Sequence, residues 1–330
     1  MTPKPYDIVL LGDYFYDLIY TGLAEFPVLG REIFSTAMTS TGGAMFITAA
    51  ALRRLGTHVG WAGTFGSDEY SGFVRELALK ENIDLRLART LDRPYRQITT
   101  SMPLHSERAF VTYSDPEPQD RYDYWLEIAE SVSYGHLHLG GVMPPHLITP
   151  ILTAAQAHGA TTSMDCQDVP ELVTACDWKR LLEVVTVFMP NAREALMVTR
   201  RDDVQSALHL LMDWVEVVVI KDSANGAWLG HGGKVIHVRG IDAGHVIDTT
   251  GAGDCFNAGF LHAWMVEKQP LEVCGLFGNI CGGLSVTGVG GATHAPTRSE
   301  LQTWLNRADT PIRVSPAHPS ARLPGQSDKA

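Results

Sequence analysis

The residues best suited to chemistry lie in one stretch, residues 246–264, which reads VIDTTGAGDCFNAGFLHAW. An apolar strand end at His245–Ile247 and an acidic turn are expected before the loop Gly251-Ala252-Gly253, and a helix is expected to start around Asp254. Because the two glycines carry no side chain, the amides of residues 252–254 can point at one place. The N–H groups of a first helical turn lack intrahelical partners, and the helix dipole is positive there. The stretch therefore predicts an anion site.

Asp254 allows two interpretations. A carboxylate in the first turn of a helix is ordinarily a cap or a partner of the dipole. A carboxylate beside an anion site, however, repels the anion unless its task is to accept a proton. An alcohol that attacks phosphorus needs both a base for its proton and donors for the charge on the transferred group. Asp254 beside the loop 251–253 supplies both.

The run from Asp248 to Phe260, DTTGAGDCFNAGF, resembles the C-terminal signature of the ribokinase/PfkB carbohydrate kinase family. The resemblance implies that Asp254 is the base that deprotonates a sugar hydroxyl. It also implies that the amides of residues 251–254 form the anion hole for the γ-phosphate of ATP, with Mg²⁺ bound between the nucleotide phosphates. Carbonyls near Asp248, Thr250 and residues 288–292 are expected to hold a monovalent cation such as K⁺, which would stiffen the anion hole.

Two further segments resemble the sugar-binding motifs of this family. A buried strand over residues 6–11 leads to Asp13 and Asp17, and an acid in the position of Asp17 hydrogen-bonds sugar hydroxyls in the family. Asp13 is a second candidate, and a merely polar loop is the alternative for both acids. Gly42 and Gly43 resemble the glycines that let the chain approach the sugar, and they are expected to open a small-residue helix. Carboxylate oxygens suit a polyol because they accept hydrogen bonds from its hydroxyls.

The chain departs from the family pattern at three sugar-contacting positions. Ile47 and Phe15 stand where members often carry Asn, and Gln167 replaces the Asn of an Asp-x-Asn motif that begins at Asp165. The lost amides and gained apolar surface predict a substrate less uniformly hydroxylated than ribose. Phe15, Phe46 and Ile47 could alternatively pack against a nucleobase.

The nucleotide side is represented by an Asn-x-x-Glu motif, Asn191 to Glu194, after a strand over residues 184–189. The resemblance implies that this motif contacts Mg²⁺ and phosphate through ordered water, with Glu194 bound to water molecules that coordinate the metal. The alternative is a reciprocal helix cap in which Asn191 is the cap and Glu194 is the third helical residue. Further nucleotide-side candidates are Lys221 at the end of a strand, Gly226 in the following loop, and Asn279 on the adenine or ribose side.

Strands and helices alternate over about 300 residues, which predicts a doubly wound α/β fold with a mostly parallel central sheet flanked by helices. The resemblance adds a small β-sheet lid formed from about 13–40 and 93–115, which would exclude water during phosphoryl transfer. Lids of this kind often pair two subunits, so a homodimer through the lid is an expectation. The kinase domain is expected over 1–310, and 311–330 is expected to be a disordered tail.

Composition narrows the partners and the compartment. The chain has 330 residues and a formal net charge of −11, which argues against nucleic acid and anionic membrane surfaces. Its five cysteines show no C-x-x-C spacing, and this pattern favours a reducing compartment. No apolar run reaches the roughly 18 residues of a membrane span, so a cytoplasmic protein is expected. His136 and His138 lie two apart on one strand face, where packing and hydrogen bonding are favoured over metal binding.

The leading hypothesis is therefore an ATP-dependent kinase that phosphorylates a hydroxymethyl group of a small sugar or sugar-like substrate. No strand is followed by G-x-G-x-x-G, and no G-x-x-x-x-G-K-[ST] occurs, which disfavours a dinucleotide oxidoreductase and a P-loop protein. Two alternatives stay open. One is a nucleoside kinase of the same family, and the other is a sugar-binding regulatory protein that keeps the fold with weak catalysis.

Overall fold

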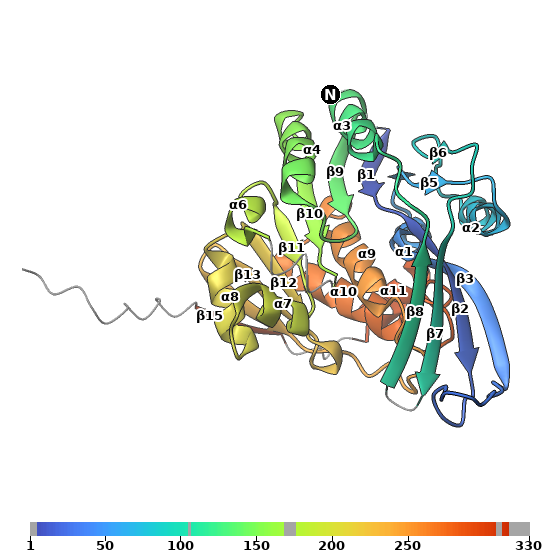
Figure 1. The fold of residues 1–330 in the computed structure, drawn as a ribbon. Coiled ribbons are helices and arrows are strands. Elements are labelled where there is room, and N and C mark those ends of the chain that lie inside the picture. Colours follow the sequence, from blue (N-terminus) through green and yellow to red (C-terminus); the bar gives the residue numbers. More distant parts are fainter. Residues whose placement is uncertain (1–4, 105–106, 168–175, 308–311, 317–330) are drawn as a thin grey trace, which may run out of the picture.

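A computed structural model describes residues 5–104, 107–167, 176–307 and 312–316. A nine-stranded central sheet runs through it in the order β15-β14-β13-β12-β11-β10-β9-β1-β4 (Figure 1). The strands from β4 to β12 pair in parallel, whereas β13, β14 and β15 pair antiparallel at one edge. The strands of this sheet are β1 (Tyr6–Leu11), β4 (Val59–Trp61), β9 (Tyr134–Leu139), β10 (Thr161–Asp165), β11 (Val187–Met189), β12 (Val217–Lys221), β13 (Ala227–His231), β14 (Lys234–Val238) and β15 (Ile312–Pro316). The predicted doubly wound, mostly parallel sheet is confirmed.

Helices cover both faces of the sheet because buried parallel strands are apolar on both sides. Ile8 and Leu10 of β1 belong to one hydrophobic core, and Val9 and Leu11 belong to the other. The first core includes residues of α1 (Met45–Leu55), α2 (Glu69–Lys80), α9 (Ala252–Met265), α10 (Leu271–Ser285) and α11 (Arg298–Leu305). The second core includes residues of α3 (Arg121–Ser131), α4 (Pro145–Ala157), α6 (Trp178–Leu182), α7 (Ala192–Thr199) and α8 (Val204–Met212).

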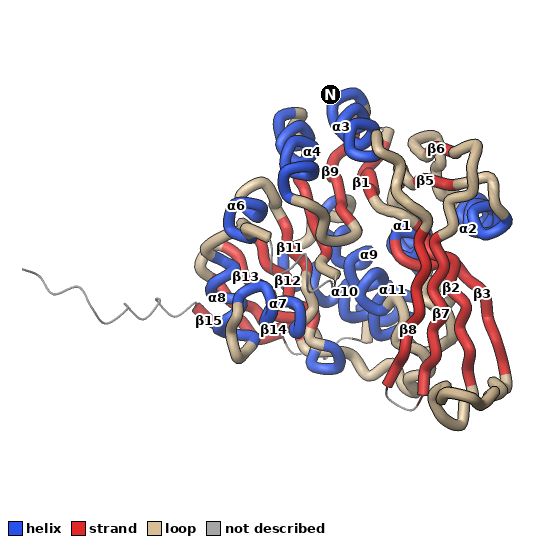
Figure 2. The backbone as a smooth tube through the Cα atoms, viewed as in Figure 1, coloured by secondary structure: helices blue, strands red, loops and turns tan. Residues whose placement is uncertain are grey.

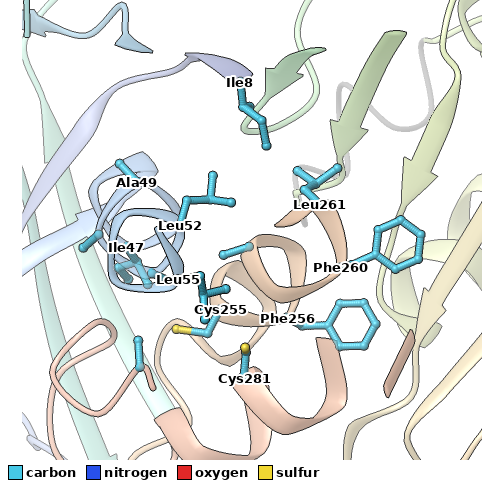
Figure 3. Packing of buried hydrophobic residues seen from close by; sticks show 14 of the residues in the cluster. Ile8, Ile47, Ala49, Leu52, Leu55, Cys255, Phe256, Phe260, Leu261 and Cys281 are labelled. Carbon is cyan, nitrogen blue, oxygen red and sulfur yellow. The ribbon is translucent and has the colours of Figure 1, made fainter. Parts of the chain in front are cut away.

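The packing of α1, α9 and α10 sets the position of the predicted anion site. In Figure 3, Leu52 and Leu55 of α1 point toward α9, and Cys255 of α9 lies near Cys281 of α10. These side chains are all at most 1% exposed. Tight apolar packing of this kind restricts the motion of the helices it joins. The first turn of α9 is therefore held against α1 by the core directly behind it.

A separate four-stranded sheet stands at the rim of the molecule (Figure 2). Its order is β3-β2-β7-β8, from β2 (Tyr14–Thr21), β3 (Ala37–Ala44), β7 (Gln97–Leu104) and β8 (Glu107–Ser114). Strand β2 follows β1 after two residues, and β3 leads directly into α1, so the small sheet is joined to the chain segments around the predicted site. The expected second sheet is therefore present. Two shorter strands, β5 (Thr64–Phe65) and β6 (Arg89–Thr90), pair separately.

Several sequence-based boundaries differ from the structure. Residues 245–247 form no strand; Val246 and Ile247 are 53% and 50% exposed, and the amide of Ile247 bonds the carbonyl of Val286 instead. The strand expected over 184–189 begins only at Val187, because residues 183–186 form the turn after α6. The start of α9 lies at Ala252, two residues before the expected one.

The tail is also not wholly irregular. Ile312–Pro316, placed in the expected disordered segment, forms β15, which pairs antiparallel with β14. An otherwise open edge strand offers a row of backbone donors and acceptors that such pairing satisfies. Residues 317–330 lie outside the described part of the chain. Among the described helices, none combines the length and the apolar character that a membrane crossing requires.

Candidate active site

The anion site predicted at the start of α9 is built by backbone that only glycine can form. Gly251 caps the helix at φ 73°, and a Cβ on it would lie 2.7 Å from the Cα of Gly291 and 2.8 Å from the Cδ1 of Ile47. A Cβ on Gly253 would meet only Lys221, with its Nζ at 3.5 Å. The amides of Gly253 and Asp254 belong to the first turn, where a helix has no carbonyl for them. An anion placed here would meet these amides and the ammonium of Lys221.

Asp248 ties this loop to a second glycine-rich loop. Its Oδ1 accepts from the amide of Thr250 at 2.9 Å, and its Oδ2 accepts from the amide of Gly290 at 3.0 Å. The side chain is 3% exposed, so these two hydrogen bonds stabilise a buried carboxylate. The Oγ1 of Thr250 is buried without a hydrogen-bond partner among the described residues. The predicted cation residues Asp248 and Thr250 thus lie beside the anion site, and Thr250 has an oxygen to offer.

Asp254 projects from the first turn of α9 and is partly exposed, as a base that must meet a substrate has to be. Its Oδ1 accepts a hydrogen bond of 3.2 Å from the hydroxyl of Thr48 on α1. Desolvation and the negative charge of Asp165 raise the pKa of Asp254 to about 7, although Lys221 and Thr48 favour the charged form. A general base works best when its pKa lies near the working pH.

Asp17 on β2 lies in the same acidic group and is 6% exposed. Its carboxylate covers Gly43, since a Cβ there would lie 2.2 Å from Oδ2. Burial raises the pKa of Asp17 to about 7, and the charges of Asp254 and Asp248 add to the shift. The charge of Asp254 therefore acts on Asp17, which places Asp17 near the first turn of α9. The structure brings the predicted base and the predicted sugar ligand together.

Gly42 and Gly43 end strand β3 rather than opening α1, which begins at Met45. Gly43 is paired with Phe15 and Gly42 with Tyr16 across the sheet. A Cβ on Gly42 would lie 2.5 Å from the ring of Phe46. The glycines therefore allow both Asp17 and Phe46 to lie close to the backbone.

Asp13 is placed in a structural ion pair. Its Oδ2 lies 2.8 Å from the guanidinium of Arg121, and the hydroxyl of Tyr95 donates to the same oxygen at 3.0 Å. Burial raises the pKa of Asp13 despite the charge of Arg121. Its Oδ1 is buried without a hydrogen-bond partner in the described chain. The role of Asp13 in substrate binding stays a prediction.

The Asn191 to Glu194 motif caps helix α7 and also lies beside the charged side chain of Lys221. Asn191 and Glu194 make the reciprocal capping pair of α7, with hydrogen bonds of 2.9 and 2.8 Å. The motif also lies next to Lys221. Lys221 forms an isolated parallel β-bridge with Asn191, and its backbone amide donates a hydrogen bond to the carbonyl of Pro190 at 2.9 Å. The negative charge of Glu194 is one of the causes that keep the pKa of Lys221 above its usual value despite burial. The capping alternative is confirmed, and the contact of the motif with phosphate or Mg²⁺ stays a prediction.

The two remaining nucleotide candidates lie at the end of β14. Gly226 has φ 98°, and a Cβ there would lie 2.1 Å from the carbonyl oxygen of Val238. The side-chain amide of Asn279 donates to the carbonyls of Val238 and Arg239 at 2.9 and 3.0 Å. Both residues therefore hold the hairpin β13–β14 in place, and their contact with a nucleotide stays a prediction.

The departures from the family pattern fall into two groups. Ile47 and Phe46 are 1% and 3% exposed, and Ile47 packs on the glycines of the two loops, so both residues belong to the core. Phe15 keeps partial exposure, and Gln167 is exposed next to Gly141. Of the three residues considered for packing a base, only Phe15 retains accessible surface.

The two histidines on β9 are structural, as expected. His136 contacts the hydroxyls of Thr161 and Ser163 at 2.7 and 2.6 Å, and His138 contacts Ser163 at 2.7 Å. Burial lowers the pKa of both rings, that of His138 to about 4, so both are neutral at pH 7. No cluster of three or more His, Cys, Asp or Glu residues suited to a metal occurs in the described ranges.

Three functional-site residues were missed by sequence reasoning. Thr48 and Asn257 contact the site through hydrogen bonds to Asp254 and Lys221, and Arg121 pairs with Asp13. Asn257 had a usable signal, because a polar residue inside the apolar run CFNAGF lies three positions after Asp254 and hence on the same helix face. Thr48 and Arg121 had none, since only the tertiary fold brings them to their partners.

The protein has a doubly wound α/β fold with a small second sheet at its rim, and an acid lies at a helix start that follows a glycine-rich loop. These features are those of a kinase of the ribokinase type. Residues 7–298 match the model of the pfkB family carbohydrate kinases, and the chain belongs to this family. It is accordingly a carbohydrate kinase, a phosphotransferase with an alcohol group as acceptor, from a family that uses ATP.

Individual relatives cover between 79% and 93% of the chain. Ribokinase of Haemophilus influenzae is 27% identical over 271 residues, which are 79% of this chain and 85% of the relative. Nucleoside kinase of Methanocaldococcus jannaschii is 25% identical over 330 residues, covering 93% and 99% of the two chains. The structure of Arabidopsis thaliana ribokinase complexed with ribose and ATP superposes with a TM-score of 0.75 at 21% identity, covering 91% of this chain and 98% of that one.

Proposed function

We propose that the protein transfers the γ-phosphoryl group of ATP to a hydroxymethyl group of a small sugar or sugar-like substrate. The observation that carries this proposal is Asp254, an acid with a pKa of about 7 in the same helical turn that offers amides to an anion. A base and an anion site thus lie within one turn of helix. Phosphoryl transfer to an alcohol requires this combination.

The acceptor lies between Asp17 and Asp254. Asp17 accepts a hydrogen bond from one substrate hydroxyl, Gly42 and Gly43 leave room for Phe46 and Asp17 to pack beside the substrate, and Asp13 is a further ligand. Asp254 takes the proton of the reacting hydroxyl while the oxygen of that hydroxyl forms a bond to the γ-phosphorus of ATP. The bond between that phosphorus and the bridging oxygen of ADP breaks in the same displacement. The amides of residues 251–254 stabilise the negative charge on the transferred group.

The nucleotide side consists of Lys221, Asn191, Glu194, Gly226 and Asn279. Mg²⁺ would neutralise phosphate charge when bound, and Glu194, which is held in its helix cap, would orient the water around the metal. A monovalent cation beside Asp248 and Thr250 is supported by the buried Oγ1 of Thr250, which has no partner among the described residues. Its effect would be to stiffen the loop that carries the anion hole.

The small sheet is proposed to close over the substrate and to pair two subunits. Apolar side chains exposed on and beside it support the second point, among them Phe34, Met38, Phe110, Val111 and Tyr113, each at least 50% exposed. By strand register Met38, Val111 and Tyr113 share one face of the small sheet, and exposed apolar surface on one face is typical of an interaction site. Light scattering on the purified protein tests the assembly: a dimer mass that falls to a monomer mass in Val111→Lys supports it, and a monomeric wild type rules it out.

The substrate is tested by measuring ADP production with a panel of pentoses, hexoses, sugar acids and nucleosides. Turnover of a monosaccharide or sugar acid is the expected result. Turnover with nucleosides alone would make the protein a nucleoside kinase, an alternative that the partly exposed Phe15 keeps open. Tight sugar binding without turnover would make it a regulatory protein and would contradict the proposal.

A further inference from the structure

Three side chains from three elements form a closed triangle behind the anion site. Lys221 of β12 donates to Oδ1 of Asp165 at 2.8 Å and to Oδ1 of Asn257 at 3.2 Å. Asn257 of α9 in turn donates its amide to Oδ2 of Asp165 at 2.5 Å. Asn257 is fully buried and the other two are 11–13% exposed, so water competes little for these contacts.

The triangle has only one consistent arrangement of donors. The Asn257 oxygen must face the ammonium and its NH2 group must face the carboxylate, because a flipped amide would place donor against donor and acceptor against acceptor. The Oδ1 of Asp165 also accepts from the amide of Cys166 at 2.7 Å, which fixes the carboxylate to the end of β10. The ammonium is therefore held from two sides.

The remaining side of the ammonium faces the start of α9. A Lys side chain has three N–H donors, and the described residues account for two of them at Lys221. A Cβ built on Gly253 would lie 3.5 Å from Nζ and 4.0 Å from Cε, and apart from its chain neighbours and its own helix backbone no other described atom lies within 4 Å. The third donor thus has access to the space above the first-turn amides.

Asp165 also keeps the ammonium away from the base. Lys221 and Asp254 affect each other's pKa, and Asp165 and Glu194 both act on Lys221 more strongly than Asp254 does. The contacts with Asp165 and Asn257 hold the ammonium beside the anion site while the carboxylate of Asp254 stays available for a hydroxyl.

We propose that Asp165 and Asn257 are positioning residues that aim Lys221 at the terminal phosphate of ATP in the anion hole. This inference rests on the proposed function. It assigns Lys221 to the phosphate that is transferred, and it distinguishes this phosphate from the two that stay with ADP. An ammonium placed there stabilises charge on the transferred group, and Asp165 and Asn257 act only through it.

The test compares binding of two nucleotides by calorimetry in the presence of Mg²⁺: the non-hydrolysable β,γ-imido analogue of ATP, and ADP. In Lys221→Met the affinity for the ATP analogue is expected to fall by about tenfold or more, the effect of one charge-assisted hydrogen bond, while ADP affinity stays within about twofold. Asn257→Ala is expected to show the same selective loss at smaller size. Leu261→Ala, a fully buried site one turn further along α9, is the control for packing damage and should change neither affinity.

Each outcome decides between different accounts. Equal losses for both nucleotides in Lys221→Met would overturn the inference, because the ammonium would then act on the phosphates of ADP or on the fold. Unchanged affinity for the ATP analogue in that variant would overturn it as well. If Asn257→Ala fails to fold, Asn257→Ser, which keeps a polar group on α9, replaces it. A wild type that binds neither nucleotide would remove the proposed function itself, so the two failures are distinguishable.

Discussion

The hydroxyl of Thr48 donates a 3.2 Å hydrogen bond to Oδ1 of Asp254, joining two helices that are 206 residues apart in the chain. Thr48 is 1% exposed and belongs to α1, the helix that begins directly after the two glycines of β3. A donor to a carboxylate favours its charged form. The substrate-side glycines and the base are therefore connected through a single helix turn.

Replacing Thr48 by Val removes this donor while keeping the shape of the side chain. The charged form of Asp254 loses a stabilising contact, so its pKa should rise and the acidic limb of the kcat–pH profile should move to higher pH by about half a unit to one unit. Thr48→Ser keeps a hydroxyl and serves as the matched control, with the limb near its wild-type position. An unshifted limb in Thr48→Val would show that the hydrogen bond does not tune the base.

The wild-type profile should lose activity as pH falls through about 7, because Asp254 must be deprotonated to accept a proton and its pKa lies there. Removing the negative neighbour in Asp165→Asn should move this limb to lower pH. Removing the positive neighbour in Lys221→Met should move it to higher pH. Opposite shifts measured by kcat between pH 5 and 9 support the assignment, whereas shifts in the same direction would mean that another group governs the limb.

The acidic group carries a cost in stability. The folded-state pKa of Asp17 is about 7, above its unfolded value, so the folded protein binds the proton more tightly. Asp17 therefore costs nothing at pH below about 4, destabilises the fold progressively as pH rises, and has its full effect above about pH 7. Asp17→Asn should raise the free energy of unfolding by about 2 kcal/mol at pH 8 and by little at pH 4. Urea unfolding at the two pH values checks this, and equal changes at both would contradict it.

A substitution at Gly253 is expected to lower activity without lowering the stability of the fold. A Cβ there makes only ordinary contacts with Lys221, and the residue is helical, so Gly253→Ala should fold with equal or slightly higher stability. The added methyl group nevertheless occupies the space where the anion is expected, and kcat should fall by at least about tenfold. Gly72→Ala on α2, where a Cβ would meet nothing within 4 Å, is the matched control and should keep wild-type turnover. Full activity in Gly253→Ala would place the anion elsewhere.

The sequence predicted those parts of the fold that depend on local pattern. Strand β1 has the expected bounds, and strand β12 ends at Lys221 as expected, because each is a short and mainly apolar run. Segment 245–247 has the same apolar character but forms no strand, since its amides bond the end of α10 and the sheet edge is taken by β15. The hydrophobic pattern of a segment alone does not determine which other segment it pairs with.

The residues of the candidate site were likewise predicted where they belong to local motifs and missed where tertiary packing brings them in. The loop 251–253, Asp254, Asp17 and Asp248 were predicted from motifs, and the structure places them together. Thr48, Asn257 and Arg121 were not, because their partners are brought to them by packing between α1, α9, β12 and α3 rather than by nearby sequence. Ile47 was read as a change in the substrate pocket, but its side chain packs behind the anion-hole loop.

The most direct test of the account is Asp254→Asn, which keeps size and hydrogen bonding but cannot accept the proton of a hydroxyl. With the best substrate of the panel, kcat is expected to fall by at least about a hundredfold, the usual contribution of a general base. Binding of the β,γ-imido analogue of ATP should persist, and thermal unfolding at pH 8 should occur at an equal or higher temperature, because a carboxyl with a raised pKa has been removed. Turnover near the wild-type rate in this folded variant would contradict the assignment of Asp254 as the base.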